Sequence, residues 1–470
     1  MPAAKNSTRT EKDSLGPKEV PADAYYGVQA LRARENFPVS GTVLPHELVR
    51  AYALVKLACA EANQKLGSVE AAKAGAIAQA AKEVADGKFQ QEFIVDVFQA
   101  GAGTSTNMNV NEVVANRALE ILGHPKGDYA FLSPNDHVNR GQSTNDTFPT
   151  SLNVSILFAF QPVEASVQQL VRSLEQKAKE FQALPKAGRT HLKDAMPVSL
   201  GTELQAYATT LRRVLGALPR VREDLCEIAL GGSAVGSGIN TAVGFRKLSV
   251  ARLAEHTGLP LRVARDPFEA MQSRRAASEA SAWLRSAAVE LTRIANDLRL
   301  LSSGPATGLD EVRLPEVQPG SSIMPGKVNP SMAECLNQIC FHVIGSDLAT
   351  SLASQAGQLE INVMMPVMAY EVLFSSRILS NFLPAFAEKC IDGLSANPER
   401  MEHFLLSSHA LATVLTPRLG YLKVAEVIKK AAASGQNPRD YLVKEGILTA
   451  AEAEELLGLK ALVKMTKPVE

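Results

Sequence analysis

The sequence predicts an all-α protein whose centre is a bundle of long helices. Three tracts carry this prediction, over residues 151–184, 198–228 and 267–302, because their apolar residues recur at helical spacing. These tracts are rich in Ala and Leu and apolar on more than one face, so each helix needs neighbours on several sides. A bundle packed between subunits meets that need. Alternation typical of strands is confined to short pieces near the N-terminus and at residues 308–315.

The elements before the bundle follow from composition and periodicity. Residues 11–36 are rich in Pro, Gly and charge, and we expect an extended arm with little regular structure there. Helical periodicity persists from about residue 46 to residue 84 and returns over residues 112–122. Residues 101–109 are expected to form a polar loop, and residues 132–150 form a second polar stretch.

The elements within and after the bundle are read in the same way. Pro219 lies inside the tract 198–228 and is expected to kink its helix. The glycine-rich residues 231–240 predict a loop. Two further helices are expected over residues 331–356 and 366–394.

The chain is expected to form three domains, since 470 residues suggest two to four. They are an N-terminal domain (1–147), a central helical bundle (148–397) and a small C-terminal helical domain (398–470). The last is set apart by shorter and more charged helical segments. These segments cover residues 425–433, 438–446 and 450–457.

Charge and cysteine content narrow the class of protein. Lys plus Arg equals Asp plus Glu, at 49 each, which argues against a nucleic-acid or membrane-surface partner. Five scattered cysteines without zinc-ligand spacing predict reduced thiols in a reducing compartment. Residues 1–12 lack the apolar core of a secretory signal, and no run of about eighteen apolar residues predicts a membrane span. We therefore expect a soluble, cytoplasmic protein.

The most informative segment is Gly320 to Pro330, which reads Gly-Ser-Ser-Ile-Met-Pro-Gly-Lys-Val-Asn-Pro. Gly and Pro at this density predict a loop. Its polar side chains suit a carboxylate ligand, because a lysine supplies positive charge while serines and an amide supply donors. Glycines let backbone N–H groups approach the anion. The side chains concerned are Ser321, Ser322, Lys327 and Asn329.

Two other interpretations of this loop remain open. It is close to a Walker A nucleotide-binding motif, but five residues separate Gly320 from Gly326 where that motif has four. Val328 also stands where Ser or Thr should bind magnesium. The second interpretation is an ordinary Gly/Pro connector with a solvated lysine, although few connectors carry this many polar donors.

Three more polar motifs accompany the loop. They are Gly101-Ala-Gly-Thr-Ser-Thr-Asn-Met-Asn109, Gly141-Gln-Ser-Thr-Asn-Asp146 and Gly188-Arg-Thr-His-Leu192. Together with residues 320–330, and in this order, they resemble the substrate-binding segments of the aspartase/fumarase superfamily of lyases, and the resemblance extends over nearly the whole chain. It implies a three-domain fold whose central helices, from four identical chains, form a homotetrameric core. It also implies a pocket assembled from several subunits.

The polar motifs suit a small dicarboxylate substrate that loses a proton next to one carboxylate. The second negative charge that develops on that carboxylate must be stabilised by nearby donors. A leaving group, ammonia or water, then departs from the neighbouring carbon. Metal ligands are missing from these motifs, and neither a dinucleotide fingerprint nor a pyridoxal-phosphate context is present, so no cofactor is expected.

Each motif residue receives an expected role, which the resemblance supports. Ser321 is the general base, activated by loop N–H groups and Lys327, and His191 orients the leaving group or relays a proton. The carboxylate that develops double charge is expected to contact Thr104, Ser105, Thr144 and Ser322. The other carboxylate is expected to contact Thr190, Lys327 and Asn329. Asn145 is expected near the leaving group, and Ser143 supports the pocket.

Simpler interpretations exist for the single motifs. Thr104 with Ser105, and Ser143 with Thr144, are also what a helix N-cap requires. A lone His191 is often structural. His137 and Arg140 either line a secondary anion site or face solvent.

Within the superfamily, the motifs resemble the ammonia-eliminating members more than the water-eliminating ones. Ala102 and Thr144 stand where class II fumarases typically carry serine. Lys193 and Met365 stand where aspartases usually have Gln and Glu. Residues 241–244 also depart from the usual family sequence after Gly-Ile-Asn. These departures leave the substrate open. The expected reaction converts L-aspartate to fumarate and ammonia. The alternatives are a fumarase or a lyase for a substituted aspartate, and an inactive tetrameric binding or structural homologue.

Overall fold

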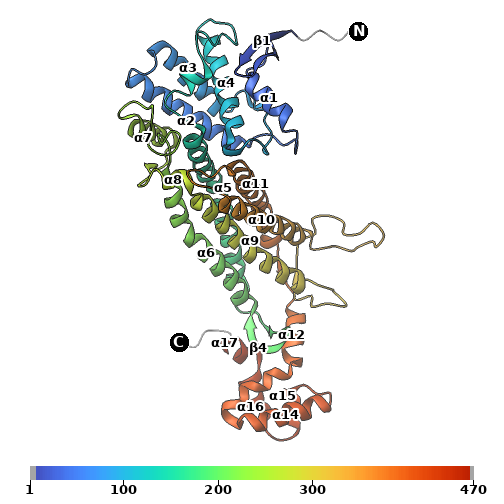
Figure 1. Cartoon of the computed structure of the whole chain (residues 1–470). Coiled ribbons are helices and arrows are strands. Elements are labelled where there is room, and N and C mark those ends of the chain that lie inside the picture. The colour runs from blue at the N-terminus through green and yellow to red at the C-terminus, as the bar shows by residue number, and fades with distance from the viewer. Residues whose placement is uncertain (1–6, 466–470) are drawn as a thin grey trace. The chain divides into compact units, whose positions relative to one another are not determined.

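The structure is a computed structural model that describes residues 7–465. The outer ends of the first and third expected domains, residues 1–6 and 466–470, lie outside the described residues. Helices dominate the described chain, which confirms the predicted all-α class (Figure 1). The chain divides into two compact units. Among the described residues, unit 1 comprises those up to 163 together with 217–286 and 341–378, and unit 2 comprises 164–216, 287–340 and those from 379 onward.

Five long helices form the predicted bundle elements, and each contributes residues to both units. The apolar faces of these helices are buried, and Leu170, Leu211 and Leu298 on them are fully buried. Pro149, Pro162, Pro219 and Pro384 lie within these helices. The five helices are α5 (Thr144–Glu180), α6 (Leu200–Leu225), α9 (Arg275–Leu301), α10 (Ser331–Gln355) and α11 (Met365–Phe386).

The expected single helix over residues 267–302 is wrong in its first part. A short helix α8 (Glu269–Gln272) ends at Ser273, whose extended backbone (ψ 137°) separates it from α9. The expected helix 366–394 is α-helical up to residue 386 and continues as a π-helical turn, η4 (Ala387–Asp392).

Unit 1 also contains a group of packed helices near the N-terminus. Helices α2 (His46–Lys65), α3 (Ala71–Ala85) and α4 (Thr104–Ile121) lie side by side (Figure 1). Helix α7 (Phe245–Thr257) packs on α2. The remaining short elements of unit 1 are η1 (Gln90–Glu92), η2 (Gly101–Gly103), η3 (Pro134–Val138) and the parallel pair β5 (Glu227–Ile228) and β6 (Arg262–Val263).

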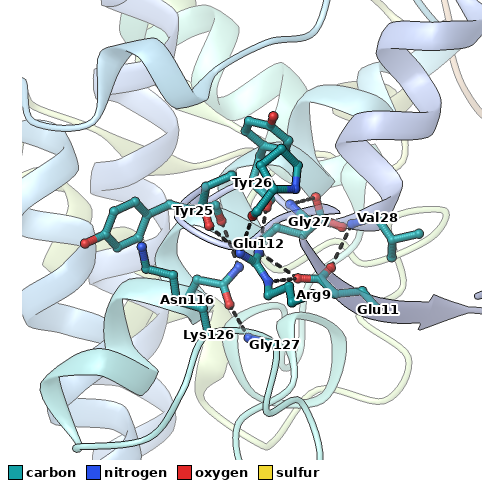
Figure 2. Close-up of polar contacts among 12 residues, drawn as sticks. Arg9, Glu11, Tyr25, Tyr26, Gly27, Val28, Glu112, Asn116, Lys126 and Gly127 are labelled. Carbon is teal, nitrogen blue, oxygen red and sulfur yellow. Dashed lines mark hydrogen bonds and ion pairs between the residues drawn. The ribbon is translucent and has the colours of Figure 1, made fainter. Parts of the chain in front are cut away.

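The expectation that residues 11–36 form an arm with little regular structure is wrong. Strands β1 (Thr8–Asp13) and β2 (Gly16–Pro21) form an antiparallel hairpin, followed by helix α1 (Val28–Asn36). Two buried glutamates hold the start of α1 (Figure 2). Glu112 of α4 accepts hydrogen bonds from the backbone N–H groups of Gly27, Gln29 and Ala30, and Glu11 accepts one from Val28.

Arg9 completes this attachment. Its guanidinium pairs with Glu11 at 2.8 Å and donates to the carbonyl groups of Pro21, Ala22, Ala24 and Tyr26. The hairpin and α1 are therefore held in place by contacts between residues distant in sequence, including those from Glu112 of α4, which no local sequence pattern shows.

Unit 2 contains an antiparallel hairpin that the sequence did not predict. Strands β3 (Pro185–Thr190) and β4 (Lys193–Ser199) pair with an irregularity at Gly188. A side chain at Gly188 would lie 2.5 Å from the carbonyl oxygen of Met196, so this position excludes any larger residue. Strand alternation is obscured here by Pro185 and Pro197 and by the scattered charged residues of both strands.

The C-terminal helices of unit 2 share one apolar core with Ala187 of β3. Leu442, Leu457 and Leu462 are its most buried leucines. The three predicted helices occur as α14 (Tyr421–Ala433), α15 (Pro438–Lys444) and α16 (Ala450–Leu457). The sequence missed the helices α12 (Pro398–Ser407), η5 (His409–Leu415), α13 (Thr416–Leu419) and α17 (Leu459–Met465), and the strand β8 (Ser395–Ala396). The strand that pairs with β8, β7 (Val312–Arg313), lies within the strand-like piece expected at residues 308–315.

Candidate active site

The first motif does not form the expected loop over residues 101–109. Helix α4 begins at Thr104, directly after Gly103 in the left-handed conformation (φ 78°). A side chain at Gly103 would lie 2.0 Å from the ring of Phe148, so both the turn and the packing require glycine. Thr104 is exposed and Ser105 is buried in the first turn of the helix. No cap hydrogen bond from a side chain is present at this helix start, so the hydroxyls of Thr104 and Ser105 do not act as its N-cap.

The second motif begins α5 and does contain a helix cap. Ser143 Oγ accepts from the backbone N–H of Asn145, and the Asp146 carboxylate accepts from the backbone N–H of Ser143 at 3.0 Å. The cap interpretation therefore applies to Ser143, which supports the segment, while Thr144 contributes a buried hydroxyl. Asn145 donates to the carbonyl group of Ala234.

Asp146 ties the second motif to the glycine-rich loop at residues 231–240. Its other carboxylate oxygen accepts from the backbone N–H groups of Gly231 (3.0 Å) and Ser233 (2.8 Å). Asp146 is fully buried, and burial raises the pKa of its carboxyl to about 6. Sequence reasoning gave no role to this residue, although it stands within the second motif.

Both motifs of unit 1 meet at one buried lysine, Lys56 of α2. Its ammonium donates to Asn107 Oδ1 of the first motif at 2.8 Å and to Gln142 Oε1 of the second at 2.9 Å. Asn139 Oδ1 is the third acceptor, at 3.0 Å. Sequence reasoning missed this residue as well. A single lysine inside the apolar run Ala-Leu-Val-Lys-Leu-Ala-Cys-Ala is the signal that could have found it.

The third motif forms the turn of the β3–β4 hairpin in unit 2. Thr190 and Lys193 face each other across the turn, and His191 and Leu192 are its two central residues. Both have left-handed backbones, with φ of 54° and 58°. A histidine and a leucine in this conformation are strained, since such turns favour Asn and Gly. Thr190, His191 and Lys193 are all exposed.

A buried ion-pair cluster holds this hairpin in unit 2. The fully buried Glu311 accepts from Arg189 at 2.9 Å and from Lys186 at 3.1 Å. Lys186 also pairs with Glu203 of α6. Glu311 belongs to the segment that precedes the fourth motif, so the cluster links the third motif to the chain that leads to the fourth.

The fourth motif is an exposed loop over residues 320–330, as predicted. It is closed by three contacts: Gly320 N–H to the Lys327 carbonyl at 2.8 Å, Lys327 N–H to the Met324 carbonyl at 3.3 Å, and Asn329 Nδ2 to the Gly320 carbonyl at 2.7 Å. Asn329 thus uses its amide N–H to shape the loop. Ser322 and Lys327 are exposed.

The hydroxyl of Ser321 lies against its own backbone. Its Oγ accepts from the backbone N–H groups of Met324 at 3.0 Å and Ile323 at 3.3 Å. Two N–H dipoles aimed at one oxygen favour negative charge there. These two contacts would also stabilise an alkoxide at this position.

The remaining candidate residues are placed as follows. Met365 is fully buried at the start of α11. His137 accepts from the backbone N–H of Ser133 through Nδ1, and burial lowers the pKa of its ring. Arg140 is exposed. The structure brings the first and second motifs together in unit 1, and it places the third and fourth in unit 2.

Along residues 7–465, no group of three or more His, Cys, Asp and Glu side chains is arranged to hold a metal ion. None of the helices described is both long and apolar enough to span a membrane. All five cysteines are free.

Two family models match the sequence. The model described as "Lyase" matches residues 16–345, and the model described as "Fumarase C C-terminus" matches residues 411–464. Together they include all four motifs and most of the C-terminal helices.

Individual relatives match over nearly the full chain. The protein named aspartate ammonia-lyase of Bacillus subtilis is 46% identical over 98% of this chain and 96% of its own length. The protein of the same name of Pseudomonas aeruginosa is 47% identical over 96% of both chains.

Solved structures give the same result for the fold. A Brucella melitensis structure titled "fumarate lyase:delta crystallin" bound to cobalt has a TM-score of 0.95 at 45% identity, covering 98% of this chain and 100% of that one. A class II fumarase of Schistosoma mansoni has a TM-score of 0.94 at 36% identity, covering 99% of this chain and 100% of that one.

Proposed function

This chain belongs to the aspartase/fumarase superfamily of lyases, and we propose that it is an aspartate ammonia-lyase, which eliminates ammonia from L-aspartate to give fumarate. The observation that carries the proposal is the Ser321 hydroxyl, held by two backbone N–H groups in an exposed glycine-containing loop. The names of the relatives supply the substrate class.

Ser321 acts as the general base. Its alkoxide is stabilised by the N–H groups of Ile323 and Met324 and removes the proton from the carbon next to the β-carboxylate. The electron pair of that C–H bond enters the carboxylate as an enolate-like dianion. It then forms the double bond as the C–N bond breaks, and the ammonium group leaves as neutral ammonia. The proton on Ser321 finally passes to ammonia or to solvent.

Neutral donors and one lysine hold the substrate. Thr104, Ser105, Thr144 and Ser322 bind the carboxylate that becomes doubly charged, because hydroxyl donors gain strength as that charge develops. Lys327, with Thr190 and Asn329, binds the other carboxylate, where a fixed cation offsets a fixed anion. Asn145 and His191 lie near the leaving group, and Ser143 supports Thr144 through the helix cap.

One assay separates this function from its alternatives. The protein is mixed with fumarate, with and without ammonium, and the loss of fumarate absorbance is followed. Ammonium-dependent loss supports aspartate formation, whereas ammonium-independent loss indicates a hydratase. A protein that consumes no fumarate and turns over no aspartate, malate or substituted aspartate is a binding or structural homologue.

The working form of the enzyme is a homotetramer in the cytoplasm. Phe341, Leu348 and Leu352 are 58%, 63% and 51% exposed on α10, and their spacing of seven and four residues places them on one face of that helix. A second copy of the chain would bury this stripe. The five free cysteines support a reducing compartment.

A further inference from the structure

We propose that Lys56 is a positioning residue for catalysis, which fixes the first and second motifs of unit 1 relative to each other through three amide contacts. This inference rests on the proposed function, because the same two motifs are expected to bind the substrate carboxylate. Lys56 itself touches none of the residues assigned to the substrate.

The burial of Lys56 requires an explanation. Its side chain is fully buried in the middle of α2, where an ammonium is costly unless all of its N–H groups are bonded. Each of the three N–H groups has one acceptor, and each acceptor is a neutral amide oxygen. Three acceptors from two segments, α4 and residues 139–142, therefore meet at one atom.

The two motif acceptors stand next to residues with expected roles. Asn107 lies two positions after Ser105 in the first motif, and Gln142 lies one position before Ser143 in the second. A shift of either amide therefore moves the hydroxyl groups that follow or precede it. Misplacement by about 1 Å is enough to lower turnover by about 100-fold.

Further hydrogen bonds fix the orientation of the amide groups around Lys56. Asn139 Oδ1 accepts from Asn107 Nδ2 at 3.2 Å and Asn111 Nδ2 at 3.3 Å, while Asn139 Nδ2 donates to the Gln142 carbonyl. Gln142 Nε2 donates to the Val138 carbonyl at 2.9 Å. The amide oxygens consequently face Lys56, and without the ammonium all three would lose the one donor that they share.

The charge of Lys56 is sensitive to alkaline pH. Burial lowers the pKa of its ammonium to about 8, and the carboxylate of Asp146 on α5 and the nearby thiol of Cys59 on α2 offset this only in part. The ring of Tyr52 on α2 lies 5.9 Å away, and the side chains that α4 and residues 139–142 direct at the ammonium are amides. Deprotonation leaves two N–H groups for three acceptors, so the motifs should loosen as the pH rises through 8.

The test compares Lys56→Met with Lys65→Met, an exposed lysine of the same helix. Methionine keeps an unbranched chain but removes the donors. We expect kcat for L-aspartate to fall by at least about tenfold in Lys56→Met and to stay within about twofold in Lys65→Met, with both variants retaining their circular dichroism. Unchanged kcat in a folded Lys56→Met variant overturns the proposal.

A second variant tests the role of the charge. Asn139→Asp places a carboxylate against Lys56 and should move the alkaline fall in kcat to higher pH, by at least about one unit. A merely structural contact would not change the pH profile in this way. An alkaline fall at the same pH as in the unmodified enzyme contradicts the role of Lys56 ionisation.

A binding measurement separates this inference from the proposed function. If the unmodified protein does not turn over L-aspartate, the proposed function fails, and titration calorimetry with succinate, an unreactive dicarboxylate, still tests the position of the motifs. We then expect Lys56→Met to weaken succinate binding by at least about fivefold relative to Lys65→Met. Equal affinity in the two variants overturns the inference.

Discussion

At the scale of single residues, the chain accepts backbone strain at a proposed functional position. His191 and Leu192 both occupy the left-handed region in a two-residue turn, where Asn and Gly are favoured. Each strained residue costs about 1 to 3 kcal/mol. Leu192 is 74% exposed, so packing does not explain its retention there. The strain is consistent with a turn shaped to present His191.

Two single substitutions separate strain from function. Leu192→Gly should raise the apparent free energy of unfolding by about 1 kcal/mol, because glycine relieves the left-handed backbone, and should leave turnover near that of the unmodified enzyme. His191→Asn should relieve strain similarly and lower kcat. Thermal unfolding and fumarate formation are measured on both. Equal kcat in the two variants would remove His191 from the reaction.

Lys56 also gives the stability of the protein a defined dependence on pH. Its pKa is about 8 when folded, against an ordinary value of 10.5, so between these values the unfolded chain binds a proton that the folded chain does not. The free energy of unfolding contributed by Lys56 therefore rises with pH across this window, by roughly 3 kcal/mol in total. Below pH 8, Lys56 is protonated in both the folded and the unfolded chain, and the folded chain bears the full free-energy cost of burying the ammonium.

The difference in stability between the unmodified protein and Lys56→Met isolates this effect. From pH 8 to pH 10.5, the unmodified protein should gain stability relative to the variant, as measured by urea denaturation. A difference that stays constant across this window would mean that Lys56 keeps its proton or that its pKa is not lowered.

At the scale of elements, local patterns found the long helices but not the contacts that shape the shorter segments. Helix α1 and its preceding hairpin depend on Arg9, Glu11 and Glu112, and the last of these is distant in sequence. The β3–β4 hairpin depends on Gly188 and on Glu311 in the same way. The first motif was expected to be a loop because its polar residues do not resemble a helix, yet they begin α4.

The attachment of α1 to α4 predicts the effect of Glu112→Ala. The substitution leaves the N–H groups of Gly27 (Figure 2), Gln29 and Ala30 without their acceptor, at a cost of about 3 kcal/mol or more. The apparent melting temperature should fall clearly, while Glu70→Ala, at an exposed helix end without a side-chain cap, should change it little. Equal melting temperatures would show that Glu112 does not anchor the arm.

At the scale of the whole molecule, the order of four polar motifs was sufficient to predict the family and the reaction class. The geometry of the motifs was not predictable, because Lys56, Asp146 and Glu311 contact residues that are distant in the sequence. In the sequence alone, each of the three is a single charged residue without a visible partner. The structure places motifs one and two in unit 1 and motifs three and four in unit 2. As the family resemblance implies, we propose that motifs from different copies of the chain complete each site.

A mixing experiment tests the shared site. Thr144→Ala and Ser321→Ala, each inactive alone, are unfolded together and refolded as hybrids. If a site draws these residues from different chains, some sites in the hybrids contain neither substitution, and activity should return to about a quarter of the unmodified level for random mixing of two chain types. Hybrids of confirmed tetrameric mass that stay inactive would place the whole site within one chain.

The central claim is that the Ser321 hydroxyl removes the proton, and turnover by Ser321→Ala tests it most directly. We expect kcat for L-aspartate to fall by about 1000-fold or more, because no other base is held in the loop, while the affinity for succinate stays close to that of the unmodified enzyme. A folded Ser321→Ala variant that makes fumarate at nearly the unmodified rate would contradict the account.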